Sequence, residues 1–221
     1  MKVKPAAWLT VSAAAAVALS FAAAPHFYPR LPLYVRSALR ERAILSQAKQ
    51  APFGALIIGD SIVESANIPR DLCGVSTLNA GIGGARISDI ARVAPSLLKV
   101  IRPQKIVFAI GINDALVDDS TSVESFRQDY LRTLAAARKG GGRIYVATIA
   151  PVGSIATTKF DLGRINEFNQ VIRSLGVNVI NLEKLAGPDG LLPAATTDDG
   201  VHLRPNGYEV WRAALEQGCA D

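Results

Sequence analysis

The chain has 221 residues, of which 49% are hydrophobic and 19% charged, and its formal net charge is +5. This is an ordinary globular composition, long enough for one domain with a full core, without a low-complexity tail or a long run of charge. Without residues 1–24, which carry Lys2 and Lys4 and no acid, 22 basic and 19 acidic groups remain. Because this small excess is scattered along the chain, it argues against a nucleic-acid partner.

The first 24 residues have the pattern of a targeting or anchoring segment. Lys2 and Lys4 make a positive start, and residues 6–24 contain no charged side chain. A helix of that length would span roughly 28 Å, close to the thickness of a hydrocarbon core. Ser20-Phe21-Ala22 fits a cleavage pattern. We therefore expect residues 1–24 to be a signal peptide or an N-terminal membrane anchor, with membrane association through residues 6–24 in the second case.

The sequence indicates an apolar segment at residues 1–24 more clearly than it indicates on which side of the membrane the rest of the chain lies. Four arginines follow the apolar run, and counting Lys and Arg alone would favour a cytoplasmic catalytic part: Arg30, Arg36, Arg40 and Arg42. Large following domains often override that count, so we expect export, to a periplasmic, extracellular or membrane-anchored location. The alternative for residues 1–24 is an Ala-rich helix buried in the domain.

The two cysteines, Cys73 and Cys219, are compatible with an oxidising compartment and one disulfide. They lie far apart in sequence, so pairing cannot be deduced, and two free buried thiols are an equal alternative. Their spacing matches no metal or redox pattern. The cysteines therefore indicate no metal or redox cofactor, and the oligomeric state stays open.

Strands and helices alternate along the chain. Residues 25–53 are expected to connect the first segment to the domain and to contain an amphipathic helix at 37–50. The domain itself is expected to span residues 54–221. Buried apolar runs predict strands at 55–58, 76–79, 106–110, 144–149 and 177–182. Helical spacing predicts helices at 87–101, 121–138, 161–175 and from 205 onward. The alternation predicts a three-layer α/β domain with a five-stranded parallel sheet.

Two of these helices carry local signals of their own. Pro95 falls inside the helix at 87–101 and is expected to kink or restart it, because proline lacks the N–H that a helix interior requires. Thr121 and Glu124 have the spacing of a capping box at the start of the next helix.

Chemically useful side chains follow the predicted strands. Ser61 follows the first strand, Gly84 the second and Asn113 the third, while Asp199 and His202 precede the last helix. In open α/β sheets, ligands bind outside the carboxyl ends of the strands, so these residues are expected to share one site. A serine, an imidazole, a carboxylate and donors for an oxyanion are the parts that an acyl-transfer site needs.

His202 is the candidate base because the chain has only two histidines, and His26 lies at the edge of the apolar start. An imidazole titrates near neutrality and can take and return a proton. Asp199, three residues before His202 on a glycine-containing loop, can orient the ring, and Asp198 is the competing candidate.

Four sequence blocks together resemble the SGNH superfamily of GDSL-type esterases and lipases. In order, they are Gly59-Asp60-Ser61, Asn79-Ala80-Gly81-Ile82-Gly83-Gly84, Gly111-Ile112-Asn113-Asp114 and Asp199-Gly200-Val201-His202. The resemblance covers roughly residues 54–217. It implies a flavodoxin-like sheet and hydrolysis of carboxylic esters without a metal.

By the same resemblance, Ser61 would be the nucleophile, His202 the base and Asp199 its orienting carboxylate. The N–H groups of Ser61 and Gly84 and the Asn113 amide would form the oxyanion hole. Ala85 and Arg86 follow Gly84, where many relatives have an acid. Arg86 could meet an acidic substrate, but a solvated or salt-bridged surface role is the commoner one.

The remaining motif residues have plainer interpretations. Gly81 and Gly83 are expected to serve the tight turn, and Asp60 and Asp114 to bond nearby backbone. The sequence thus predicts a serine esterase acting through an acyl-enzyme, with short acyl groups such as acetyl on glycans as its substrates. Alternatives are a lysophospholipase or thioesterase, an O-acyltransferase on the same site, or a non-catalytic envelope-binding domain.

Overall fold

The computed structural model describes residues 32–220. The expectations for residues 1–24, their cleavage and their membrane association therefore lie outside the described residues. The chain divides into two compact units, Met1–Leu39 and Arg40–Asp221. The fold presented below is that of the second unit. Helix α2 (Leu33–Gln50) begins in the first unit and ends in the second, and it starts four residues before the expected helix.

A five-stranded parallel sheet forms the centre of the second unit, as the sequence predicted. Its strands are β1 (Ala55–Gly59), β2 (Thr77–Gly81), β3 (Lys105–Ala109), β4 (Arg143–Ala147) and β5 (Asn178–Ile180). The order across the sheet is β2-β1-β3-β4-β5, and every neighbouring pair is parallel. This is the flavodoxin-like order, in which the chain reverses direction across the sheet between β1 and β3.

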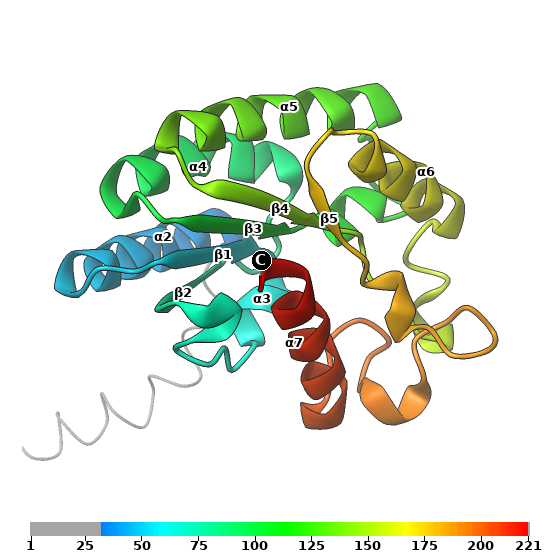
Figure 1. Cartoon of the computed structure of the whole chain (residues 1–221). Coiled ribbons are helices and arrows are strands. Elements are labelled where there is room, and N and C mark those ends of the chain that lie inside the picture. Colours follow the sequence, from blue (N-terminus) through cyan, green and yellow to red (C-terminus); the bar gives the residue numbers. More distant parts are fainter. Residues whose placement is uncertain (1–31, 221) are drawn as a thin grey trace, which may run out of the picture. The chain divides into compact units, whose positions relative to one another are not determined.

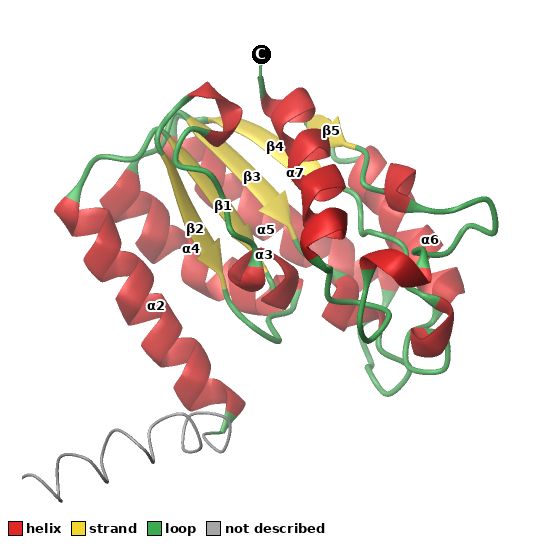
Figure 2. Cartoon of the chain, turned by 90° about the horizontal axis from the view of Figure 1, so that it is seen from below, coloured by secondary structure: helices red, strands yellow, loops and turns green. Residues whose placement is uncertain are grey.

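Helices cover both faces of the sheet and complete three layers. The helices of the domain are α3 (Ser61–Ser65), α4 (Ile87–Ile101), α5 (Val123–Gly140), α6 (Leu162–Arg173) and α7 (Pro205–Cys219). In Figure 1, α4, α5 and α6 lie above the sheet, and α3 and α7 lie below it. Figure 2 shows α3 at the arrowhead end of the strands, where their carboxyl ends meet.

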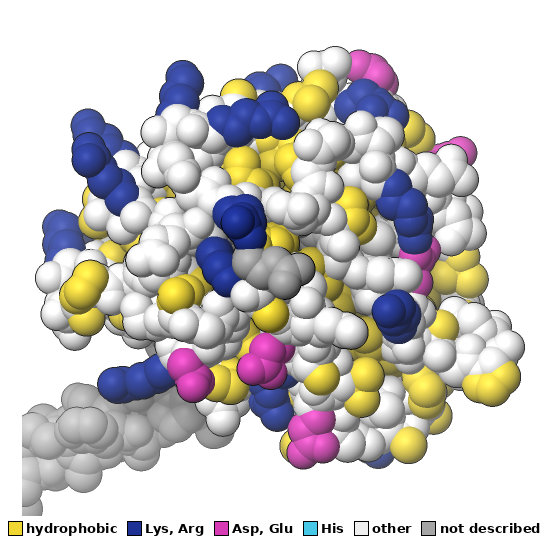
Figure 3. Space-filling view, viewed as in Figure 1, with side chains coloured by type: hydrophobic (Ala, Val, Ile, Leu, Met, Phe, Trp, Pro, Cys, Tyr) yellow, Lys and Arg dark blue, Asp and Glu magenta, His cyan; other side chains and the backbone are white. Residues whose placement is uncertain are grey.

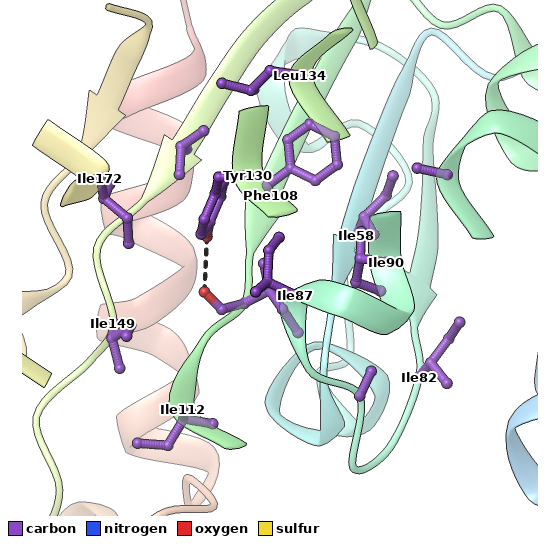
Figure 4. Close-up of a cluster of buried hydrophobic side chains, with 14 of the residues drawn as sticks. Ile58, Ile82, Ile87, Ile90, Phe108, Ile112, Tyr130, Leu134, Ile149 and Ile172 are labelled. Atoms are coloured by element: carbon purple, nitrogen blue, oxygen red, sulfur yellow. Dashed lines mark hydrogen bonds between the residues drawn. The ribbon is translucent and has the colours of Figure 1, made fainter. Parts of the chain in front are cut away.

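The core consists of two clusters of buried side chains, one on each face of the sheet. Successive strand residues alternate between them: Leu56 and Ile58 face the cluster under α4, α5 and α6, and Ile57 faces the cluster under α7. Figure 4 shows part of the first cluster, where the hydroxyl of buried Tyr130 donates a 2.9 Å hydrogen bond to the Ile110 carbonyl. Burial on both faces explains why the strands are unbroken apolar runs in the sequence.

Two local expectations for helices differ from the structure. Helix α4 does not restart at Pro95; it runs from Ile87 to Ile101 with the proline inside it, because its buried apolar side chains continue on both sides of the proline. A kink at Pro95, the other expected outcome, stays a prediction. The capping box of α5 closes one residue later than predicted, between Ser122 and Ser125. Glu124 accepts a hydrogen bond from Gln128 instead, one turn further along.

The structure joins Cys73 and Cys219 in a disulfide, which settles the alternative that the sequence left open. The bond ties the short helical turn at Leu72–Gly74 to the end of α7 across 146 residues. Beside it, the Lys105 ammonium donates to the carbonyls of Cys73 (3.1 Å) and Cys219 (2.6 Å). The end of the chain is therefore fastened to the start of β3.

The face seen in Figure 3 carries basic side chains that are scattered among neutral and apolar ones rather than gathered over one element. Across residues 32–220, no helix is both long enough and apolar enough to cross a membrane.

We predict that replacing both cysteines by alanine destabilises the fold. A cross-link over a loop of this length restricts the unfolded chain, and removing it costs about 2–5 kcal/mol. Urea unfolding followed by circular dichroism measures this loss as a lower midpoint. A double variant with the wild-type midpoint would show that the disulfide contributes nothing to stability.

Candidate active site

The carboxyl ends of three neighbouring strands bring the first site residues together. Gly59 at the end of β1 pairs in register with Gly81 of β2 and Ala109 of β3. The chain leaves these aligned ends into the three segments that carry Ser61, Gly84 and Asn113. Because the strands are parallel and in register, short connections suffice to place all three segments at one edge of the sheet.

Ser61 is the first residue of α3, and Asp60 caps that helix. The Asp60 carboxylate accepts a 2.9 Å hydrogen bond from the Ile62 N–H, so the chain turns sharply from strand to helix. A Cβ at position 59 would lie 2.3 Å from both the Ala109 carbonyl oxygen and a Val63 methyl group. Glycine is therefore needed at this turn, which presents the Ser61 hydroxyl beyond the end of the sheet.

His202 lies on the loop before α7, and three kinds of contact shape this loop. The Thr197 hydroxyl donates to the His202 carbonyl and accepts from the Gly200 N–H. The Gly200 carbonyl in turn accepts a 2.7 Å hydrogen bond from the Gly153 N–H. Gly200 has φ +83°, and a Cβ there would lie 2.7 Å from that of Ala156. Only glycine fits this position without strain.

The loop places His202 between Asp199 and Ser61. One ring nitrogen, Nδ1, lies 2.6 Å from an Asp199 carboxylate oxygen, and the other, Nε2, lies 2.8 Å from the Ser61 hydroxyl. The second Asp199 oxygen accepts from the N–H groups of Val201 and His202. The three side chains thus form one chain of hydrogen bonds. Asp198, the competing candidate, pairs with Arg204 instead.

Asp199 stays ionised in this environment. Its partial burial alone would raise the pKa of the carboxyl group. Hydrogen bonds from the His202 ring and from the two backbone N–H groups outweigh that effect and lower the pKa of Asp199 to about 2. A carboxylate held in this way favours the ring tautomer with a proton on Nδ1, which leaves Nε2 free to accept the Ser61 proton.

Gly84 and Asn113 occupy adjacent segments of the same edge. Residues 82–85 form a turn closed by a 3.1 Å hydrogen bond from Ala85 N–H to the Ile82 carbonyl, with Gly84 at φ +75°. Asn113 lies in the short helical turn Ile112–Ala115 after β3, and its side-chain amide donates 2.9 Å to the Ala85 carbonyl. The Asn113 amide is therefore anchored next to Gly84.

The two motif aspartates are buried and bond to backbone. Asp114 accepts from the Ile87 N–H at the start of α4, as Asp60 does from Ile62. Burial raises the pKa of each carboxyl group to about 7, although these hydrogen bonds oppose it. For Asp114, the nearby Asp119 and Asp60 raise the pKa further and Arg86 lowers it. Arg86 itself forms a 2.5 Å ion pair with Asp119, whose side chain is buried while that of Arg86 stays partly exposed.

Several residues that hold this site have no motif signal in the sequence. The Tyr208 hydroxyl of α7 donates to the Ile62 carbonyl of α3 at 2.8 Å. Arg40 of α2 and Glu64 of α3 both bond to the segment that carries Gly84. These contacts join residues far apart in sequence, so no local pattern could have shown them.

This arrangement has the parts of a nucleophilic site. A serine hydroxyl touches an imidazole whose other nitrogen is held by a carboxylate, and two potential oxyanion donors lie on neighbouring segments. Among residues 32–220, no group of three or more His, Cys, Asp and Glu side chains could hold a metal ion.

Comparisons with known proteins agree on one family. The model of the GDSL-like lipase/acylhydrolase family matches residues 57–210. A comparison with curated proteins gave no match. Among solved structures, a Streptococcus pneumonia protein named for platelet activating factor is similar at 21% identity and TM-score 0.75, covering 91% of this chain and 99% of its own.

Two further solved structures share the fold. A GDSL-like lipase from Bacteroides thetaiotaomicron is 15% identical with a TM-score of 0.70, over 81% of this chain and 96% of that one. An acetylxylan esterase from Geobacillus stearothermophilus is 15% identical with a TM-score of 0.59, over 76% and 94% of the two chains.

We predict that Asp114→Asn makes stability less dependent on pH. Because the pKa of Asp114 is raised from 3.8 to about 7 on folding, its contribution to stability is largest below pH 4 and is lost as pH rises toward 7. The loss is on the order of 2–4 kcal/mol. Urea unfolding of wild type and variant at pH 4 and pH 7 measures it. Equal pH dependence in the two proteins would contradict the raised pKa.

Proposed function

Because the chain belongs to the GDSL-like lipase/acylhydrolase family, a family of carboxylic ester hydrolases, we propose that it is a serine esterase that works through an acyl-enzyme. The observation that carries the proposal is the continuous hydrogen-bond chain from Ser61 through His202 to Asp199. A serine in this setting loses its proton to the imidazole as it attacks a carbonyl.

In the proposed reaction, Ser61 Oγ attacks the ester carbonyl carbon while His202 Nε2 takes the hydroxyl proton. The tetrahedral intermediate collapses, the ester C–O bond breaks and His202 returns the proton to the departing alcohol. A water molecule then attacks the acyl carbon while His202 Nε2 takes its proton. The bond between the acyl carbon and Ser61 Oγ breaks, the acid leaves, and His202 returns the proton to Ser61. Asp199 stays ionised throughout and stabilises the imidazolium that forms in each half of the cycle.

The oxyanion is proposed to bind the N–H groups of Ser61 and Gly84 and the Asn113 amide. Ser61 is at the start of a helix, where the N–H groups have no partner within the helix. Gly84 is the third residue of its turn and has φ +75°, a conformation that favours glycine at this position. Such fixed donors stabilise charge that develops on the carbonyl oxygen in the transition state.

Short acyl groups, such as acetyl on glycans, are the proposed substrates. The side chains of His202 and Asp199 are 45% and 50% exposed, so a bulky polymer can bring an ester to Ser61 without entering a deep tunnel. The acetylxylan esterase with the same fold acts on that kind of ester by its name. This likeness supports the proposal by analogy of fold.

A lysophospholipase or thioesterase activity is the second candidate, because apolar surface lies close to the catalytic loop. Ile155 is 65% exposed, and its Cγ1 would lie 3.1 Å from a Cβ at Gly200. A cleft of about 350 Å³ lies beside the segment that follows β4, lined partly by Ile149, Val152 and Leu191. A longer acyl chain would cover the exposed Ile155 side chain.

We also propose that the protein works outside the cytoplasm. The apolar N-terminal sequence is the signal for export, and the Cys73–Cys219 disulfide supports it, since disulfides persist in oxidising compartments.

We predict that Ser61→Ala lowers hydrolysis of p-nitrophenyl acetate by about 10⁴-fold or more, because no other group in the site can form the acyl-enzyme. The circular dichroism spectrum should stay that of wild type. Hydrolysis at the wild-type rate by the purified variant would rule out Ser61 as the nucleophile.

A series of p-nitrophenyl esters of increasing chain length tests the substrate class. We expect kcat/KM to fall sharply beyond short acyl groups, because the proposed substrates carry acetyl. An increase with chain length would instead support the lipid or thioester candidate. Product analysis in the presence of acceptor sugars distinguishes the two remaining activities. A hydrolase releases the free acid, whereas an O-acyltransferase forms an acylated sugar.

A further inference from the structure

The loop that carries Gly84 is held from two sides by a pair of charged residues, Arg40 and Glu64. Arg40 comes from α2, before the first strand, and Glu64 comes from α3, three residues after Ser61. Neither touches the Ser61–His202–Asp199 chain through any hydrogen bond found in residues 32–220. Both instead bond to the segment between the end of β2 and Gly84.

Arg40 forms hydrogen bonds to the end of β2. Its Nε donates 2.8 Å to the Gly81 carbonyl, and one terminal nitrogen donates 3.1 Å to the Asn79 carbonyl and 3.2 Å to the Asn79 side-chain oxygen. The Arg40 side chain is only 20% exposed. A guanidinium this deeply placed is oriented by all three acceptors, which a shorter or single-donor side chain cannot satisfy together.

Glu64 forms a hydrogen bond to the turn that contains Gly84. One carboxylate oxygen accepts the Gly83 N–H at 2.5 Å, and the other lies 3.6 Å from Arg40 Nε. A Cβ at position 83 would lie 2.6 Å from the Glu64 oxygen that accepts the Gly83 N–H, so a larger residue there would displace the carboxylate. The residue before the Gly84 peptide is therefore bonded directly to the helix that presents Ser61.

Asn79 completes the connection between the two helices and the turn. Its side-chain amide donates to the carbonyls of Val63 and Ala66 at the end of α3, and its oxygen accepts the Gly81 N–H. A Cβ at Gly81 would lie 2.1 Å from the Glu64 nitrogen. Strand end and helix backbone are thus packed directly against each other.

The turn is consequently fixed on both sides of Gly84. Glu64 holds the Gly83 N–H before it, and the Asn113 amide holds the Ala85 carbonyl after it. The Gly84 N–H, the proposed oxyanion donor, lies between these two fixed points. An oxyanion donor stabilises a transition state only when its direction is set before the charge develops.

We propose that Arg40 and Glu64 are positioning residues of the oxyanion hole, which makes the middle of α2 part of the catalytic apparatus. This inference rests on the proposed esterase function. It adds that the sequence before residue 54, expected to be a connecting segment, supplies a residue on which the rate of acyl transfer depends.

Two pairs of variants test the proposal in the full chain. Glu64→Ala removes the acceptor of the Gly83 N–H, and Arg40→Gln removes the guanidinium that donates to the carbonyls of β2. Each has a matched control on α5, away from the loop: Glu124→Ala loses one exposed carboxylate hydrogen bond, and Arg132→Gln loses the ion pair with Asp129. Thermal unfolding of all four variants checks that each is folded.

With p-nitrophenyl acetate, Glu64→Ala and Arg40→Gln should lower kcat by about 10–100-fold with little change in KM, since a misdirected donor acts mainly on the transition state. The affinity for a trifluoromethyl ketone, whose adduct with Ser61 places an oxyanion in the hole, should fall in proportion. The control variants should keep both values. Glu64→Gln, which keeps a neutral acceptor, and Arg40→Lys should recover part of the rate.

Amide hydrogen exchange supplies a readout that does not depend on turnover. The Gly83 N–H should exchange faster in Glu64→Ala than in wild type, while the core strands keep their protection. Unchanged exchange at Gly83, or faster exchange with wild-type kcat and inhibitor affinity, would overturn the proposal. If wild type itself shows no Ser61-dependent hydrolysis, the proposed function fails, and the exchange result alone decides whether Glu64 holds the loop.

Discussion

The hydrogen bond between Ser61 and His202 joins two residues that are 141 positions apart, and the rest of the fold serves to keep that contact. The parallel sheet holds Ser61 at the end of β1, and the loop before α7 holds His202 against it. The Tyr208 hydroxyl ties α7 to the carbonyl of Ile62, and the Cys73–Cys219 disulfide fastens the far end of the same helix. Both ends of α7 are therefore fixed relative to the nucleophile.

Glycines at the sheet edge let the backbone segments of the site approach one another closely. Gly59, Gly81 and Gly200 each occupy a position where a Cβ would meet another atom at 2.7 Å or less. Buried carboxylates at Asp60 and Asp114 cap the segments that follow the strands. These residues explain why each sequence block contains residues besides the proposed reacting groups. Most residues of a block form the turns and caps that bring the reacting groups together.

The sheet, its five strands and the segments carrying Ser61, Gly84, Asn113 and His202 could be predicted because their signals are local. Apolar runs mark buried strands, three of the sequence blocks lie where a strand ends, and the fourth lies just before the last helix. Contacts between distant residues could not be predicted. The sequence left the pairing of Cys73 and Cys219 open because it depends on how α7 packs. In the sequence, Arg40 is only one charge on a predicted amphipathic helix. Its hydrogen-bond acceptors lie 39 and 41 residues further along the chain, so no local pattern indicates its role. Helix α4 does not restart at Pro95, because buried side chains on both sides of the proline keep the helix packed against the sheet.

The most direct test of the account is the rate at which a fluorophosphonate modifies the protein, with the site located by peptide mass mapping. The account predicts modification of Ser61 alone, and a rate at least about 10³-fold lower in His202→Gln, because the imidazole accepts the Ser61 proton as the hydroxyl attacks phosphorus. Modification of another residue, or an unchanged rate in His202→Gln, would contradict the claim that this hydrogen-bonded chain activates Ser61.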